Sequence, residues 1–99
     1  MLNDSAALDL AFQALSDPTR REILRMLRKR PMNAGELAEA FEMTKGSLSH
    51  HYNILKAAEL VRCERRGQFL VYSLNTSVIE DVMALLVDLF GSEKKKERP

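Results

Sequence analysis

The segment Thr44–Val61, TKGSLSHHYNILKAAELV, constrains the fold of this chain most, because it combines helical periodicity with two chemically different faces. Leu48, Tyr52 and Leu55 recur at i, i+4 and i+7, a spacing that places them on one side of an α-helix, against a core. The opposite side has hydrogen-bonding groups and no acid, and consists of Lys45, Gly46, Ser49, His50 and Asn53. Such a face suits base edges and phosphates. The segment therefore predicts a recognition helix that enters a DNA groove.

A short helix with its own start signal precedes this segment. Asn33 followed three residues later by Glu36 has the form of a capping box, and the apolar positions after it end near Glu42. Thr44 can cap the next helix, so the interval between the two helices is only about two residues long. This spacing predicts a tight helix-turn-helix.

Two further helices are expected before that motif. Four apolar residues at helical spacing indicate the first: Leu8, Ala11, Phe12 and Leu15. Asp17 can then cap a second helix that has Pro18 at its first position and runs to about Arg28.

Beyond Ala58 the pattern changes from helical to extended. Residues 61–65 and 69–74 are rich in β-forming side chains, and Arg66-Gly67 between them predicts a β-hairpin with a basic tip, a wing. A last helix is expected from a Thr76 or Ser77 cap to Gly91, and it is apolar around most of its circumference. A domain this small covers only one side of such a helix, so a second copy is expected to cover the other.

Length and composition indicate one soluble domain. The 99 residues suffice for one core, placed at residues 1–90, and residues 91–99 are expected to form a disordered basic tail because SEKKKERP has no apolar residue. The sequence has no membrane-length apolar run and no signal-peptide pattern, and its single cysteine excludes an internal disulfide, so a cytoplasmic protein is expected. The predicted fold class is mainly α with a small β-hairpin: a homodimeric winged helix-turn-helix in the order α-α-α-α-β-β-α.

The net charge of +1 conceals a strong pattern. Residues 17–30 carry a net charge of +4 and residues 44–68 carry +3, whereas residues 1–16, 31–43 and 69–92 are all net acidic. If the fold brings the two basic segments onto one surface, that surface favours a polyanion. The alternative is an ordinary solvated mosaic of charges.

Four stretches together resemble one family: ALSDPTRREIL, MNAGELAEAF, SLSHHYNILKAAELV and GQFLVYSLN. Over about residues 8–90, the chain is similar to the ArsR family of bacterial winged-helix repressors. Within that family it is most similar to the SdpR-like autorepressor branch. The resemblance implies a homodimer that binds double-stranded DNA at an inverted-repeat operator in its own promoter. It also implies a membrane signalling partner that sequesters the repressor.

The metal sensing of that family is not expected here. Asn33 and Gly35 stand where the family's Cys-x-Cys site falls, and the last helix has no histidine. His50 and His51 are adjacent on a helix and diverge by ~100°, so they cannot chelate one ion together. Neither a cofactor nor enzyme activity is expected, because the sequence has no phosphate loop, metal cluster or activated nucleophile.

The candidate residues fall into three groups. Base reading is assigned to Lys45, Ser47, Ser49, His50 and Asn53. Contacts to the DNA backbone or through the wing are assigned to Thr44, Gly46, His51, Tyr52, Arg65, Arg66 and Gln68. The dimer interface is assigned to Leu8, Phe12, Val82, Leu85, Leu86, Leu89 and Phe90.

Several of these assignments have alternatives. His51 and Tyr52 could pack inside the protein, and Arg20 is as compatible with an internal salt bridge as with a phosphate contact. For Cys63 a half-buried packing role is favoured, and the alternative is a redox- or ligand-responsive repressor that uses its thiol. The rival function from another class is a winged-helix protein-interaction module whose basic wing binds an acidic partner.

Overall fold

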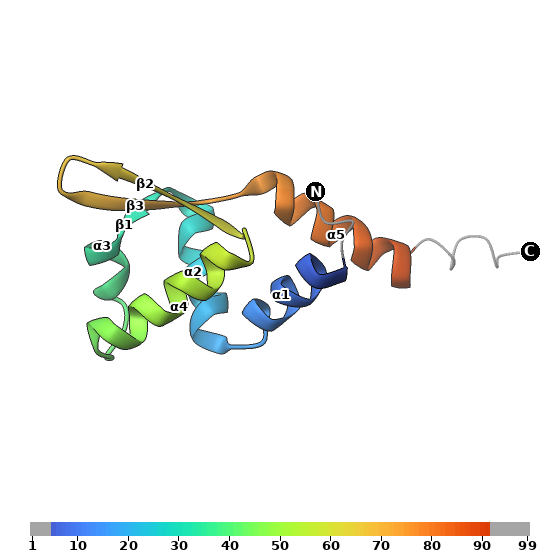
Figure 1. The fold of residues 1–99 in the computed structure, drawn as a ribbon, viewed down its shortest axis with the longest axis horizontal. Helices are drawn as coiled ribbons and strands as arrows, with labels where there is room; N and C mark the ends of the chain where they lie inside the picture. Colours follow the sequence, from blue (N-terminus) through green and yellow to red (C-terminus); the bar gives the residue numbers. More distant parts are fainter. Residues whose placement is uncertain (1–4, 92–99) are drawn as a thin grey trace, which may run out of the picture.

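The computed structural model describes residues 5–91, which form five α-helices and three short β-strands. In chain order these elements are α1 (Ser5–Leu15), α2 (Pro18–Lys29), β1 (Met32–Asn33), α3 (Ala34–Ala38), α4 (Lys45–Ala57), β2 (Val61–Arg66), β3 (Phe69–Leu74) and α5 (Thr76–Phe90). The β2-β3 hairpin lies at one end of the molecule and α5 at the other, with α2 and α4 between them (Figure 1). The predicted winged helix-turn-helix is confirmed. The predicted tail, apart from Gly91, lies outside the described residues.

The sheet contains one strand that the sequence did not predict. Its strands are antiparallel in the order β1-β3-β2, and in β1 Met32 pairs with Tyr72 and Asn33 with Val71. Two residues are too few to show a period of two, so no sequence pattern reveals such a strand. The position of β1 is decided by β3, which lies about forty residues further along the chain.

The tip of the hairpin is a two-residue turn. The register runs from Val61 opposite Leu74 to Arg66 opposite Phe69, which makes Arg66 the last residue of β2 and leaves Gly67-Gln68 as the turn. Gly67 has φ +61, and a Cβ built there would meet nothing within 4 Å. The turn therefore requires glycine for its backbone conformation, and a side chain would meet no steric obstacle.

The predicted starts of α2 and α3 are confirmed. Asp17 Oδ2 accepts a hydrogen bond from the Arg20 N–H at 3.1 Å, with Pro18 at the first helical position. In α3, Asn33 Oδ1 accepts from the Glu36 N–H at 2.8 Å, and Glu36 Oε1 accepts from the Asn33 N–H at 2.9 Å. This reciprocal pair is the capping box. The Asn33 N–H bond, followed by the one from Arg30, lowers the pKa of Glu36.

α3 is shorter than expected. The prediction that it extends to about Glu42 is wrong, because the helix ends at Ala38. The chain continues in i→i−3 hydrogen bonds, the last from the Phe41 N–H to the Ala38 carbonyl at 3.1 Å. These tighter turns satisfy the terminal carbonyls without a further α-helical turn. Residues 39–44 therefore separate α3 from α4, and the two-residue connection is not observed.

α4 ends in a tight reversal. The helix ends at Ala57, so the predicted change from helical to extended structure after Ala58 is confirmed, and Glu59 adopts φ 60 at the reversal. The N–H of Glu59 donates to the Lys56 carbonyl at 2.9 Å, and the N–H of Leu60 donates to the Leu55 carbonyl at 3.1 Å. This pair of bonds is a Schellman motif, which usually has glycine where Glu59 stands. Leu55 and Leu60 are both fully buried, so the motif anchors the start of the wing in the core.

The start of α5 also differs from the prediction. Neither Thr76 nor Ser77 caps it, because Asn75 occupies the N-cap position. Asn75 makes no side-chain cap bond; its Oδ1 accepts from Arg62 Nη2 at 3.2 Å, and its N–H donates to the Leu60 carbonyl at 3.0 Å. Contacts with the start of the wing therefore place this residue.

α5 buries only one side. Val78 and Val82 are buried, whereas Met83, Val87 and Phe90 are 59%, 58% and 73% exposed. This confirms the expectation that one chain cannot cover the whole helix. Within residues 5–91, no helix is both long enough and apolar enough to cross a membrane.

Candidate nucleic-acid interface

The two faces of α4 are separated as predicted. Leu48, Tyr52 and Leu55 are 2%, 5% and 0% exposed and belong to the core. The outward positions are all exposed: Lys45, Gly46, Ser47, Ser49, His50 and Asn53. The helix therefore presents one cation, two hydroxyls, an imidazole and an amide on a surface that has no carboxylate. These groups can donate to and accept from base edges.

The N-terminus of α4 is capped by a side chain, and two of its N–H groups lie before the helical hydrogen bonds. Thr44 Oγ1 accepts from the Ser47 N–H at 3.1 Å, which confirms Thr44 as the helix cap. The first intrahelical bond runs from the Leu48 N–H to the Thr44 carbonyl, so the N–H groups of Lys45 and Gly46 precede the helical ladder. At Gly46 an added Cβ would come no closer than 3.9 Å to Thr44 Oγ1. The fold itself therefore does not require this glycine, although it lowers helix propensity by about 1 kcal/mol relative to alanine.

His51 packs inward, against a buried arginine. Its Nδ1 lies 3.1 Å from Arg20 Nη1, and its side chain is only 15% exposed. Arg20 also donates from Nε to the Ala14 carbonyl at 2.8 Å and from Nη2 to the Gln13 carbonyl at 3.0 Å. The internal alternative for Arg20 is therefore correct, with backbone carbonyls and a histidine in place of the salt bridge. His51 acts as a packing residue, and its assignment as a DNA contact is wrong.

Asp17 lies beside the same pair, and its carboxylate is 3.9 Å from His51 Nδ1. Desolvation by its neighbours raises the pKa of Asp17, but the Arg20 N–H and the nearby positive charges outweigh it, so the net pKa lies below its usual value. Asp17, Arg20 and His51 together connect the start of α2 with α4. No local sequence pattern reveals this cluster, because Arg20 and His51 are 31 positions apart.

Tyr52 is a core residue. Its hydroxyl donates to the Ala34 carbonyl at 3.3 Å, and its ring centroid lies 4.9 Å from that of Tyr72. Burial raises the pKa of Tyr52, and burial together with the neighbouring Cys63 raises the pKa of Tyr72 to about 12. The assignment of Tyr52 to the DNA backbone is therefore wrong, because its ring and hydroxyl connect α4 to β3 and to the start of α3.

The wing is exposed and basic. Arg65, Arg66 and Gln68 are all exposed at its tip. Arg66 Nη2 lies 3.0 Å from Glu64 Oε1, an exposed ion pair that salt and a competing phosphate can open. Phe69 is also exposed, at 49%, directly after the turn. The alternation of side chains along a strand places Phe69 on one face of the hairpin, but alternation alone does not show which of the two faces packs against the core.

The apolar surface of α1 and α5 agrees only in part with the predicted interface. Phe12, Leu86, Leu89 and Phe90 are exposed, and Leu8 and Leu85 are half-buried. Val82 is 5% exposed and packs in the core of its own chain, so its assignment to a free interface is wrong. Three exposed apolar residues were missed: Leu10, Met83 and Val87. The helical period showed that α5 is apolar around most of its circumference, but it did not show which of these apolar residues pack against the chain's own core.

The two histidines do not converge. The ring centroids of His50 and His51 are 5.9 Å apart, and the ring planes are tilted by 55°. Within residues 5–91, no group of three or more His, Cys, Asp or Glu side chains lies close enough together to hold a metal ion.

An exposed polar helix in a helix-turn-helix, followed by a basic antiparallel hairpin, defines the class of winged helix-turn-helix transcriptional regulators. Residues 17–62 match the family described as "Bacterial regulatory protein, arsR family". The chain belongs to this family, whose fold and relatives are those of regulators and not of enzymes.

Individual relatives agree with this membership. Transcriptional repressor SdpR of Bacillus subtilis (strain 168) is 56% identical over 70 residues, which are 71% of this chain and 78% of that protein. HTH-type transcriptional regulator NmtR of Mycobacterium tuberculosis is 40% identical over 75 residues, which are 74% of this chain and 62% of that protein. The crystal structure of an ArsR family transcriptional regulator is 29% identical, covers all of both chains and has a TM-score of 0.85.

Proposed function

We propose that this chain is a DNA-binding transcriptional repressor that acts as a homodimer on an inverted repeat and represses its own promoter. The observation that carries the proposal is the outward face of α4, where every predicted base-reading residue is exposed and no acid is present. The relatives named as repressors and the family membership support the same function. Base reading is assigned to the five exposed side chains Lys45, Ser47, Ser49, His50 and Asn53.

Phosphate contacts are assigned to two other places. The Lys45 and Gly46 N–H groups at the positive end of α4 suit one phosphate, with Thr44 holding the first turn. Arg65, Arg66 and Gln68 at the wing tip have the reach for flanking phosphates or the minor groove. A dimer that neutralises several phosphates should lose DNA affinity steeply as the salt concentration rises.

The dimer is supported by the uncovered apolar surface of α5. Met83, Leu86, Val87, Leu89 and Phe90 are exposed along it, and Phe12 on α1 is exposed as well. Exposed apolar patches of this kind mark interaction sites. A two-fold dimer would present two α4 helices to half-sites about one helical turn, ~34 Å, apart.

The test separates base readers from phosphate contacts. DNA sequences bound by the full-length protein are selected from a random pool, and the affinity of variants is then measured on the selected site and on random DNA. Ser49→Ala and His50→Ala should weaken binding to the selected site more than to random DNA, whereas Arg66→Ala should weaken both. Equal losses on both DNAs for all three variants would refute the assignment of base readers.

Two rival functions remain distinguishable. A winged-helix module that binds an acidic protein would select no DNA at all from the pool. A repressor switched through Cys63 would lose operator binding in step with thiol oxidation, which mass analysis after peroxide detects. Packing is favoured over this second rival, because Cys63 is half-buried against the core and opposite Tyr72 in the hairpin. The sequestering membrane partner implied by the resemblance would be tested by co-purification from membranes.

A further inference from the structure

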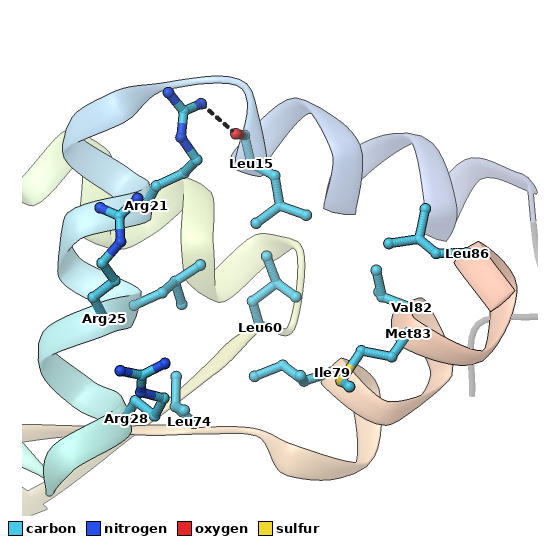
Figure 2. A pocket seen from close by; sticks show the side chains of 11 residues that line it. Leu15, Arg21, Arg25, Arg28, Leu60, Leu74, Ile79, Val82, Met83 and Leu86 are labelled. Atoms are coloured by element: carbon cyan, nitrogen blue, oxygen red, sulfur yellow. Dashed lines mark hydrogen bonds between the residues drawn. The ribbon is translucent and has the colours of Figure 1, made fainter. Parts of the chain in front are cut away.

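Among the residues that the structure describes, the exposed large apolar side chains lie in two separate places. Most of them are on α1 and α5, where the proposed second copy would cover them, and Figure 2 shows Met83 and Leu86 of this set. Met43, Phe69 and Leu70 lie elsewhere, with Met43 directly before the cap of α4 and the other two on β3. Figure 1 shows the hairpin tip at the same end of the long axis as the N-terminus of α4, and α5 at the other end. A dimer through α1 and α5 therefore leaves the apolar residues of the wing uncovered.

Phe69 projects from the outer face of the hairpin. Side chains alternate along a strand, so Leu70 shares a face with the buried Tyr72, and Phe69 lies on the opposite face. In the antiparallel register Phe69 stands opposite Arg66, which places the ring and the guanidinium on the same face. The ring is 49% exposed, so about half of its surface is free for a partner.

The tip of the wing is narrow and basic. Residues 64–70 are all exposed, so neither face of the hairpin is covered there. Gly67 has no side chain, and a Cβ at that position would meet nothing within 4 Å. Within this stretch Arg65 and Arg66 outnumber the one acid, Glu64. Minor-groove proteins combine such groups: arginines follow the narrow groove, and an apolar side chain such as phenylalanine enters between base pairs.

We propose that the wing enters the minor groove next to the half-site read by α4, and that Phe69 wedges partly between two base pairs there and kinks the operator. Arg66 lies across the hairpin from the ring, and its exposed 3.0 Å ion pair with Glu64 opens when a phosphate competes for the guanidinium. Pyrimidine–purine steps unstack most easily, so the operator should contain such a step at this position although no side chain reads its bases.

DNA fits this tip better than an acidic protein surface does. A stack of base pairs offers flat apolar surfaces inside a polyanion, which matches an aromatic ring beside two arginines. The tip also shares its end of the molecule with the start of α4, whose outward face has no carboxylate. The proposal rests on the proposed function, because the wing reaches a minor groove only if α4 binds the adjacent major groove.

The test measures bending and unstacking of the selected DNA site by the full-length protein. Fluorophores at the two ends of the duplex report the bend by energy transfer. 2-Aminopurine, placed in turn at each adenine outside the α4 half-sites, reports unstacking by increased fluorescence. The parent protein should bend the site by about 20° or more and brighten a 2-aminopurine at one step severalfold. Phe69→Ala should lose at least half of the bend and all of the brightening, whereas Phe69→Leu, which keeps an apolar wedge, should keep most of both.

Leu70→Ala is the matched control. It truncates an exposed apolar side chain at the next position of the same strand, on the opposite face of the hairpin. This variant should leave the bend and the fluorescence unchanged. Equal effects of Leu70→Ala and Phe69→Ala would refute the assignment of the wedge to Phe69.

Three other results would overturn the proposal. A site that the parent binds but leaves straight, or that Phe69→Ala bends as the parent does, would refute the wedge even if the variant binds more weakly. Binding of a poly(Glu,Tyr) copolymer as tightly as the selected DNA, and lost in Phe69→Ala, would assign the tip to an acidic protein. Failure to select any DNA from the random pool would refute the proposed function itself, an outcome that is distinct from binding without a bend.

Discussion

Arg20→Met tests whether one buried guanidinium holds α1, α2 and α4 together. Arg20 is 9% exposed and makes three side-chain hydrogen bonds, to the carbonyls of Ala14 and Gln13 near the end of α1 and to His51 on α4. Methionine keeps an unbranched apolar stem and removes all three bonds. The variant therefore removes the connection with little change in packing volume.

The expected loss is about 3 kcal/mol in the free energy of unfolding. The 2.8 Å bond to the Ala14 carbonyl is the buried one, and leaving that carbonyl unpaired costs about 2 kcal/mol. The two partly buried bonds, at 3.0 Å and 3.1 Å, add about 1 kcal/mol, because the desolvation cost of burying the Arg20 guanidinium, which methionine avoids, offsets part of their loss. For a urea dependence of about 1–3 kcal/mol per M, the unfolding midpoint should fall by about 1–3 M.

Arg21→Met is the matched control. Arg21 is the next residue of the same helix, but it is exposed and makes a single 2.9 Å bond to the Leu15 carbonyl. Its replacement should cost less than about 1 kcal/mol. Both variants are unfolded in urea and followed by circular dichroism at one protein concentration, because association shifts apparent stability. Equal midpoints for the two variants would refute the structural role of Arg20.

Three further predictions concern local features. Glu59→Gly should raise the free energy of unfolding by about 0.5–1 kcal/mol relative to Glu59→Ala in thermal unfolding, because φ 60 strains any residue except glycine; a lower stability would contradict the Schellman geometry. Tyr52→Phe should cost about 1 kcal/mol in urea unfolding by removing the bond to the Ala34 carbonyl, while a gel shift should show unchanged DNA affinity. The lowered pKa of Asp17 stabilises the fold above the unfolded value of about 3.9, and this contribution is lost as pH falls through the lower folded value. Asp17→Asn, which keeps the cap, should therefore lose less stability than the parent between pH values of about 6 and 3 in urea unfolding, and equal losses would refute this reasoning.

Local signals predicted the starts of α2, α3 and α4 and the position of the hairpin, because each depends on residues close together in the chain. Asp17 and Asn33 each cap a helix by accepting a hydrogen bond from the N–H three residues later. Gly67 adopts the positive φ that the turn of the hairpin needs. The end of α3 and the conformation of the reversal after α4 were predicted less well. The tight turns that follow Ala38 and the reversal at Glu59 involve ordinary residues where glycine would have signalled an end.

The polar face of α4 was fully contained in the sequence, because helical spacing alone decides which of its residues lie opposite Leu48 and Leu55. The residues at the edges of that face, His51 and Tyr52, could not be assigned from the sequence. His51 and Tyr52 could point toward DNA or toward the core, and Arg20 and Tyr72, which come from other elements, decided that both point inward.

Periodicity, capping and composition were enough to predict the order of the helices and the hairpin, the exposed polar face of α4 and the need to cover α5. Three features depend on the packing of distant segments: β1 joins the sheet, Arg20 connects α1 with His51, and Val82 faces its own core. Each of these depends on contacts between distant segments, whose geometry is set when the helices pack and not by any local pattern.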